Sequence, residues 1–206
     1  MKVTARTIIL ASASPRRQAI LSQLGLPFLI RLQDVEEDLV STSAECAADA
    51  AERLACRKAA VGASEFEAGL VIAADTVVVA NGRIYGKPAD AEEAGKMLRE
   101  LSGRSHYVIT GVAVYDVANG RLESGYARTR VTFRPLTDEV IAAYVASQEP
   151  LDKAGAYGIQ GLGSLLVESI AGCYFNVVGL PLALLTDLLA AHGFDIWRAS
   201  RRKEGD

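Results

Sequence analysis

The sequence has few of the residues that metal-centred or disulfide-rich proteins need. Its three cysteines, Cys46, Cys56 and Cys173, form no C-x-x-C pair, and only two histidines are present to complete a zinc site. We therefore predict neither a zinc centre nor a disulfide framework. The cysteines are expected to be small core residues or free thiols in a reducing compartment.

Long apolar runs and an excess of one charge are also missing. No stretch approaches the length of a membrane-spanning helix, and the apolar run 8–10 is far shorter than the centre of a signal peptide. The formal net charge of -3 gives no general electrostatic reason to bind nucleic acid or an anionic membrane. We expect a cytoplasmic protein without either partner, in which locally placed Arg and Lys hold any anionic ligand.

The chain does contain enough apolar material for a substantial core, with 50% hydrophobic residues over a length of 206. One compact domain over residues 1–199, followed by a charged and frayed tail over 200–206, is the simplest organisation. Apolar runs and helical spacing predict its elements. The strands are 7–11, 70–80, 107–117, 121–133 and 165–170, and the helices begin near residues 15, 43, 91, 138 and 180.

Turn and cap residues support these ranges. Ser14 is a good N-cap for the first helix, and Thr42 with Glu45 makes a capping box for the second. Asn119-Gly120 is a strong signal for a two-residue hairpin turn. Strands and helices alternate early and a hairpin then intervenes, so we predict an α/β protein with a mixed sheet and helices on its faces.

Asp75 interrupts the apolar run 70–80. A carboxylate inside an apolar strand loses its hydration, so it should meet a cation or a metal that compensates for the loss. The alternative is a strand that ends earlier and leaves Asp75 in a solvated turn.

The turn between the first strand and the first helix reads Ser12-Ala13-Ser14-Pro15-Arg16-Arg17. The first amide groups of a helix lack internal partners and lie at the positive end of the helix dipole. An anion there is held by the main chain together with Arg16. A phosphate site is the functional interpretation, and an ordinary cap with two solvent-exposed arginines is the alternative.

Three other features are ambiguous when taken singly. Lys87, in the turn Gly86-Lys87-Pro88, can reach a phosphate, but it and Lys58 on the second predicted helix also fit the pattern of solvated lysines. The acids Glu36-Glu37-Asp38 can gather a divalent cation through oxygen ligands or simply form a solvated turn.

The segment 149–161 is long, punctuated by glycine and chemically mixed, which is typical of a ligand-contacting loop. Within it, Gln160 offers both donors and acceptors, which suits recognition of a nucleobase edge. The sequence has neither a dinucleotide-binding fingerprint nor a Walker lysine motif. His106 and His192 are expected to be structural or surface residues, because neither pairs with a nucleophile in a readable motif.

Taken in order, five segments resemble the signature segments of the Maf family. They are Leu10 to Arg17, Ala74 to Val78, Gly86 to Pro88, Leu101 to His106 and Tyr144 to Gly161. The resemblance covers residues 7 to 189. It implies a Maf/ITPase-like fold, which is an elongated, twisted mixed sheet flanked by helices, with two lobes and a central cleft.

The resemblance also implies an activity, which is metal-dependent hydrolysis of a nucleoside triphosphate to the monophosphate and pyrophosphate, with Mg²⁺ or Mn²⁺ as cofactor. Asp75 matches the catalytic carboxylate. Arg16, Thr76 and Gln160 match the positions tied to the choice of dTTP and UTP. A sister branch that favours 7-methyl-GTP has glutamine after the catalytic aspartate, so Thr76 argues for the pyrimidine branch.

Within this framework we expect Asp75 and an acid such as Glu37 to hold the metal, which lowers the pKa of an attacking water. The substrate is expected to contact Arg16 and four further residues, Ser12, Lys58, Lys87 and Lys153. Whether Asp75 is a general base, a metal ligand or both stays open. A non-enzymatic inhibitor of septum formation is the competing class, and a homodimer is one option for the oligomeric state.

Overall fold

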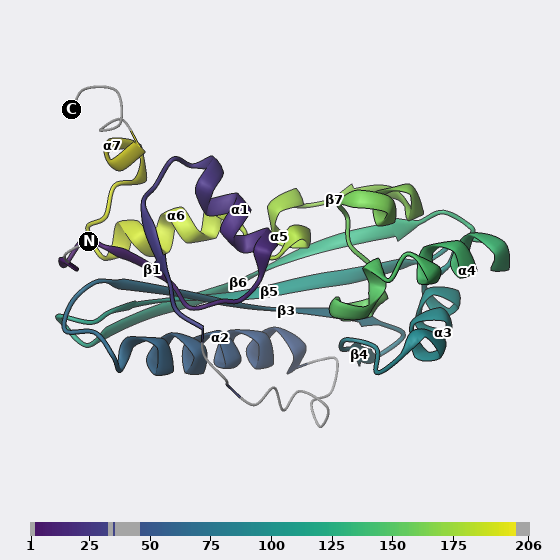
Figure 1. The fold of residues 1–206 in the computed structure, drawn as a ribbon, viewed down its shortest axis with the longest axis horizontal. Coiled ribbons are helices and arrows are strands. Elements are labelled where there is room, and N and C mark those ends of the chain that lie inside the picture. Colours follow the sequence, from purple (N-terminus) through teal and green to yellow (C-terminus); the bar gives the residue numbers. More distant parts are fainter. Residues whose placement is uncertain (1–2, 33–34, 36–45, 201–206) are drawn as a thin grey trace.

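The computed structural model describes residues 3–32, 35 and 46–200. Within these residues, one mixed sheet of seven strands runs along the length of the molecule, and helices cover both of its faces (Figure 1). The predicted α/β class with a mixed sheet flanked by helices is confirmed. None of the helices in these ranges is long and apolar enough to cross a membrane.

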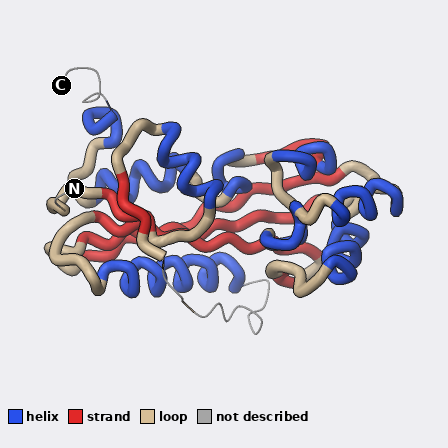
Figure 2. The backbone as a smooth tube through the Cα atoms, in the orientation of Figure 1, coloured by secondary structure: helices blue, strands red, loops and turns tan. Residues whose placement is uncertain are grey.

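The strands are β1 (Ile8–Leu10), β2 (Phe28–Ile30), β3 (Leu70–Ala80), β4 (Arg83–Tyr85), β5 (Ser105–Asp116), β6 (Arg121–Phe133) and β7 (Val167–Ala171). The α-helices are α1 (Pro15–Gln23), α2 (Ala47–Ala63), α3 (Ala91–Leu101), α4 (Asp138–Ala146), α5 (Tyr174–Val178), α6 (Leu182–Ala191) and α7 (Ile196–Ser200). Three 3₁₀ turns, η2 (Glu149–Asp152), η3 (Ala154–Ala156) and η4 (Gly161–Leu166), lie between α4 and β7 (Figure 2).

The predicted strand 70–80 coincides with β3, and the predicted hairpin strands coincide with β5 and β6 to within one or two residues at each end. The predicted two-residue turn is wrong, because four residues, 117–120, connect β5 to β6. Asp116 accepts hydrogen bonds from the amides of Ala118 and Asn119, and this stabilises the longer turn. The predicted capping box of α2, Thr42 with Glu45, lies outside the described residues.

The sheet combines parallel and antiparallel pairing in the order β2-β1-β3-β5-β6-β7, with β4 also on β3. β5 pairs with one edge of β3 along residues 70–79. The other edge of β3 is shared by two short strands, since β1 pairs with residues 70–72 and β4 with residues 78–80. Residues 73–77 therefore have no described strand partner on that edge, which is open as far as the described strands are concerned.

Helices pack differently on the two faces of the sheet. On one face, α2 lies close to the strands through alanines such as Ala51, Ala55 and Ala59. Gly111 of β5 permits this approach, because a Cβ there would lie 2.4 Å from the main-chain carbon of Ala51. On the other face, α1, α5 and α6 bury larger side chains, including Leu185. The close approach of α2 brings its polar side chains to the middle of the sheet.

The apolar core forms separate clusters at the two ends of the sheet. One cluster contains Ala74 of β3 and packs under α1 and α6. Another contains Val78 of the same strand and packs against α3 and α4. Thr76 lies between these clusters on the same face of β3, and Asp75 lies on the opposite face, between the clusters that contain Ala73 and Val77. Both residues are at the open part of the β3 edge. The core thus surrounds a polar centre.

Candidate active site

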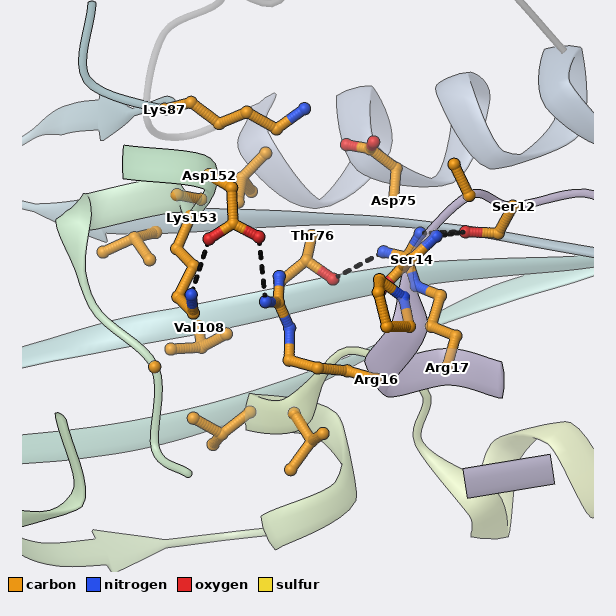
Figure 3. Close-up of a pocket in the computed structure, with 18 of the residues that line it drawn as sticks. Ser12, Ser14, Arg16, Arg17, Asp75, Thr76, Lys87, Val108, Asp152 and Lys153 are labelled. Carbon is orange, nitrogen blue, oxygen red and sulfur yellow. Dashed lines mark hydrogen bonds and ion pairs between the residues drawn. The ribbon is translucent and has the colours of Figure 1, made fainter. Parts of the chain in front are cut away.

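A cavity of about 680 Å³ lies at the open part of the β3 edge. Its lining comes from the end of β1, the start of α1, α2, β3, the turn before α3 and the segment from η2 to η4 (Figure 3). It includes every predicted site residue that the structure describes, namely Ser12, Arg16, Lys58, Asp75, Thr76, Lys87, Lys153 and Gln160. Glu37, the second predicted metal ligand, lies outside the described residues.

Asp75 is one of the residues that line this cavity. It lies in the middle of β3 and pairs with Gly111 of β5, which excludes the alternative of a solvated turn. The side chain is buried, and its Oδ1 accepts a hydrogen bond from Lys58 Nζ at 2.7 Å. Oδ2 is also buried, but it has no hydrogen-bond partner among the described residues. Since a buried carboxylate oxygen without a hydrogen bond is costly, Oδ2 is suited to accept a hydrogen bond from a ligand or to bind a cation.

The start of α1 presents main-chain donors to the same cavity. Ser14 is the N-cap, but its side chain makes no capping hydrogen bond, and the first turn contains no acidic residue. Amide groups at a helix start that no side chain caps attract anions, assisted by the helix dipole. Arg16 extends from this turn towards Asp152, and its Nη1 lies 3.3 Å from Oδ2 of that residue. Arg16 therefore lies in the cavity lining in an ion pair, and the phosphate site expected at this segment stays a prediction.

Arg17, to which the sequence gives no separate role, links three parts of the site. Its guanidinium donates to Ser12 Oγ at 3.2 Å, to Thr76 Oγ1 at 3.1 Å and to the carbonyl of Gly179 at 2.8 Å. Thr76 Oγ1 also lies 3.0 Å from Thr110 Oγ1 of β5. These contacts hold the Thr76 hydroxyl in one orientation.

The opposite side of the cavity carries further charges. Lys87 lies in the turn after β4, and the carbonyl of Gly86 beside it accepts a hydrogen bond from the Gly155 amide. Asp152 accepts hydrogen bonds from both Arg16 and Lys153 (Figure 3). Burial opposes ionisation of Asp152, but these two cations outweigh that effect and hold its pKa below the usual value. The sequence did not indicate a role for Asp152. One of its partners, Arg16, is 136 residues away, and the other, Lys153, is an adjacent lysine of the kind that is common on surfaces.

A buried histidine packs behind the cavity wall on this side. His106 Nε2 lies 2.7 Å from the hydroxyl of Tyr157, which lines the cavity, and the two rings pack edge to face with Phe133. Burial lowers the pKa of His106 to about 4, so the ring is neutral at pH 7. The structural role expected for His106 agrees with this position.

Metal ligands are sparse among the described residues. No three side chains of the types His, Cys, Asp and Glu gather there in a way that could hold a metal ion. Oδ2 of Asp75 does fit one position in a metal's coordination shell, because it is an oxygen donor to which no described residue donates a hydrogen bond. The three cysteines are free thiols, and Cys46 is exposed rather than in the core.

These observations define a class of protein. A mixed α/β sheet places a buried carboxylate–lysine pair, an uncapped helix start and several further cations around one cavity. Such a set of donors suits a polyanionic ligand that is bound at phosphate groups. The class is therefore an α/β protein whose cavity suits a ligand with phosphate groups and has a buried carboxylate in its lining.

Comparison with known proteins gives the family. Residues 7–192 match the family described as Maf-like protein. A protein of Moorella thermoacetica named dTTP/UTP pyrophosphatase is 52% identical over 92% of this chain and 97% of its own length. Proteins of the same name from Pelotomaculum thermopropionicum and Bacillus cereus are 49% and 47% identical, over 93% and 94% of this chain and 99% and 100% of their own lengths. The chain belongs to the Maf family.

Among solved structures, the Staphylococcus aureus Ham1 protein aligns with 96% of this chain and 95% of its own, with a TM-score of 0.47 and 14% sequence identity. This likeness is too distant to support an argument about function.

Proposed function

We propose that the protein hydrolyses dTTP and UTP to the nucleoside monophosphate and pyrophosphate. The observation that carries this proposal is the buried Asp75–Lys58 pair, which faces a cavity lined by Arg16, Lys87 and Lys153. The cavity volume of about 680 Å³ lies within the range of small-ligand pockets. The name shared by the relatives supports the choice of substrate.

The triphosphate is held by groups from two sides of the cavity. The start of α1 and Arg16 bind from one side, while Lys87 and Lys153 bind from the other. Fixed cations and oriented amides stabilise the charge that develops on the phosphoryl oxygens during transfer. Because Asp152 contacts both Arg16 and Lys153, binding of the phosphates redistributes these contacts.

The reaction is an attack of water on the α-phosphorus. Asp75 takes a proton from the water as the bond between the water oxygen and phosphorus forms. The bond between the α-phosphorus and the bridging oxygen breaks, and pyrophosphate leaves with the electron pair. Lys58 keeps the Asp75 carboxylate oriented through Oδ1, which leaves Oδ2 for the water or for a ligand.

A divalent cation fits this site through Asp75 Oδ2. When bound, Mg²⁺ or Mn²⁺ would neutralise phosphate charge and lower the pKa of a bound water. Glu37 stays a proposed second ligand.

The residue proposed to select the base is Gln160. It lines the same cavity, whose lining also includes apolar side chains such as Val78 and Val108. A pocket that pairs its polar groups with one base edge disfavours a base that leaves those groups unpaired. We therefore assign recognition of the uracil or thymine edge to Gln160.

The test is a comparison of kcat/KM for dTTP, UTP, CTP, GTP and 7-methyl-GTP with divalent metal present. We expect dTTP and UTP to be preferred, with pyrophosphate released in one step and no nucleoside diphosphate accumulating. A preference for 7-methyl-GTP would move the protein to the sister branch. Absence of turnover on every triphosphate would favour the non-enzymatic alternative, which does not account for the buried carboxylate.

A further inference from the structure

The segment that carries Gln160 is fastened at both ends by one pair of side chains. Tyr144 of α4 donates a hydrogen bond to Glu149 Oε1 at 2.9 Å, and its hydroxyl accepts one from the Gly158 amide at 3.2 Å. Glu149 accepts hydrogen bonds from the amides of Leu162 and Gly163, both at 3.0 Å. The segment 158–163 therefore lies across the Tyr144–Glu149 pair.

The hydrogen-bond partners of Glu149 require a carboxylate at this position. Burial alone would raise the pKa of Glu149, but the hydrogen bonds from Gly163, Leu162 and Tyr144 outweigh it and hold the pKa below the usual value. Both oxygens of Glu149 act only as acceptors, because all of these partners are donors. An amide in place of the carboxylate would direct an N–H group at a donor.

The main chain is shaped to approach this carboxylate closely. Gly161 has a φ of +65°, a backbone conformation that residues other than glycine rarely adopt. A Cβ on Gly161 would lie 2.7 Å from Glu149 Oε2. The backbone directly after Gln160 is thus fitted to Glu149.

Base selection needs such a fixed segment. The side-chain amide of a glutamine can rotate by 180° and exchange the positions of its donor and acceptor. By itself it can therefore pair with uracil or with cytosine. Discrimination requires that the main chain and its neighbouring polar groups hold one arrangement. Tyr144 and Glu149 are absent from the cavity lining that the structure describes, so they act on the base without touching it, and the hydrogen bonds of their side chains lead to this segment.

We propose that Glu149, assisted by Tyr144, is a positioning residue that sets base specificity by holding the segment 158–163 and with it Gln160. This inference rests on the proposed function, because it assigns the means by which the same site selects its base. It adds two residues that do not touch the substrate.

The primary variant is Glu149→Gln, with Glu168→Gln on the exposed surface of β7 as the matched control. We expect Glu149→Gln to reduce the ratio of kcat/KM for UTP to that for CTP by about 10-fold, the effect of one lost polar contact. The rate on CTP itself should change little. Tyr144→Phe keeps the ring in the core and should shift the ratio in the same direction by a smaller factor. The control should leave the ratio unchanged.

A double-variant cycle with Gln160→Ala separates positioning from general destabilisation. If Glu149 acts through Gln160, then Glu149→Gln has no further effect on the UTP to CTP ratio once Gln160 is alanine. Equal losses on UTP and CTP, or the same reduction of the ratio in both backgrounds, would overturn the proposal. If Glu149→Gln fails to fold, Tyr144→Phe serves in the same cycle.

Hydrogen exchange gives a readout that does not depend on turnover. We expect the amides of residues 158–163 to exchange faster in Glu149→Gln than in wild type, with the exchange of β3 unchanged. Unchanged exchange in this segment would overturn the proposal even if the enzyme is active. Faster exchange in an enzyme that does not prefer UTP would support positioning while contradicting the proposed substrate.

Discussion

The two sides of the cavity are built from different kinds of secondary structure. On the chemical side, Asp75 and Lys58 come from β3 and α2, which are long regular elements packed in the core. On the side to which we assign recognition of the substrate, here called the recognition side, Lys153 and Gln160 come from the connections between 3₁₀ turns. A charge that must stay out of water needs a rigid support, whereas contacts that read a substrate can be placed on loops.

The supports of the two sides differ in the same way. Asp75 is held by the strand register of the sheet and by one direct ion pair with Lys58. Gln160 is held indirectly, through the hydrogen bonds that Glu149 makes to main-chain amides. Substitutions on the chemical side should therefore remove turnover, and substitutions on the recognition side should redistribute it among substrates.

The largest effect is expected for Asp75→Asn. The amide preserves the shape of the side chain but removes its basic charge, so kcat should fall at least ~100-fold without loss of folding. Steady-state kinetics and a thermal unfolding curve measure the two quantities. Asp116→Asn is the control, because Asp116 is a buried carboxylate that caps the β5–β6 turn outside the cavity lining. Near wild-type kcat in Asp75→Asn would refute the assignment.

A smaller loss is expected for Arg16→Ala, which removes a cation at the junction of the two sides. Charge-assisted contacts are stronger than neutral ones, so kcat/KM for UTP should fall about 10-fold or more. Arg99→Ala is the control, since Arg99 forms an exposed ion pair with Asp138 away from the cavity. Equal small effects from both substitutions would show that Arg16 is an ordinary surface residue.

Gln160→Ala should change selectivity more than rate. We expect the ratio of kcat/KM for UTP to that for CTP to fall by about 10-fold, because one orphaned polar group costs about 1 to 3 kcal/mol. Measurement of both substrates on wild type and variant gives the ratio. An equal loss on both substrates would place Gln160 in general binding and would blur the distinction between the two sides.

The smallest effect on activity is expected at His106, which supports the recognition side from the core. Its pKa is about 4 in the folded protein, against an ordinary value of 6.5. Above pH 6.5 both the folded and unfolded chains carry neutral histidine, so this group makes no contribution to pH dependence. Between pH 6.5 and 4 only the unfolded chain binds the proton, so the free energy of unfolding falls by about 1.4 kcal/mol per pH unit.

Denaturation in urea between pH 7 and pH 4.5, on wild type and on His106→Gln, isolates this contribution from the carboxylates that both proteins share. The variant should show a shallower fall in stability over that range, with kcat at pH 7 close to wild type. Identical slopes would show that His106 does not remain neutral in the folded protein.

Local patterns predicted much of the fold and the chemical side. The valine-rich run gave β3 with its full bounds, and the same run made Asp75 conspicuous. The ion pair of Asp75 with Lys58 was harder to predict, because it depends on how closely α2 approaches the sheet. That approach depends on Gly111, whose importance is visible only once α2 is in place.

The recognition side was less predictable, since its order comes from contacts between distant residues. The segment 149–161 was expected to be a loop, but it contains the short helical turns η2 and η3. The side chains of Glu149 and Tyr144 hydrogen-bond to each other and to the amides of Gly158 and Gly163. β4 and α5 were also missed, because both are short and neither has a distinctive period. Arg17 binds partners that are 59 and 162 residues away, and no local signal indicates such contacts.

The position of bond cleavage tests the central claim most directly, because Asp75 is assigned to activate water for attack on the α-phosphorus. UTP is hydrolysed in ¹⁸O-labelled water under single-turnover conditions, and mass spectrometry locates the label in the products. We predict one labelled oxygen in UMP and an unlabelled pyrophosphate. Label in the pyrophosphate, or labelled orthophosphate as the first product, would contradict the account.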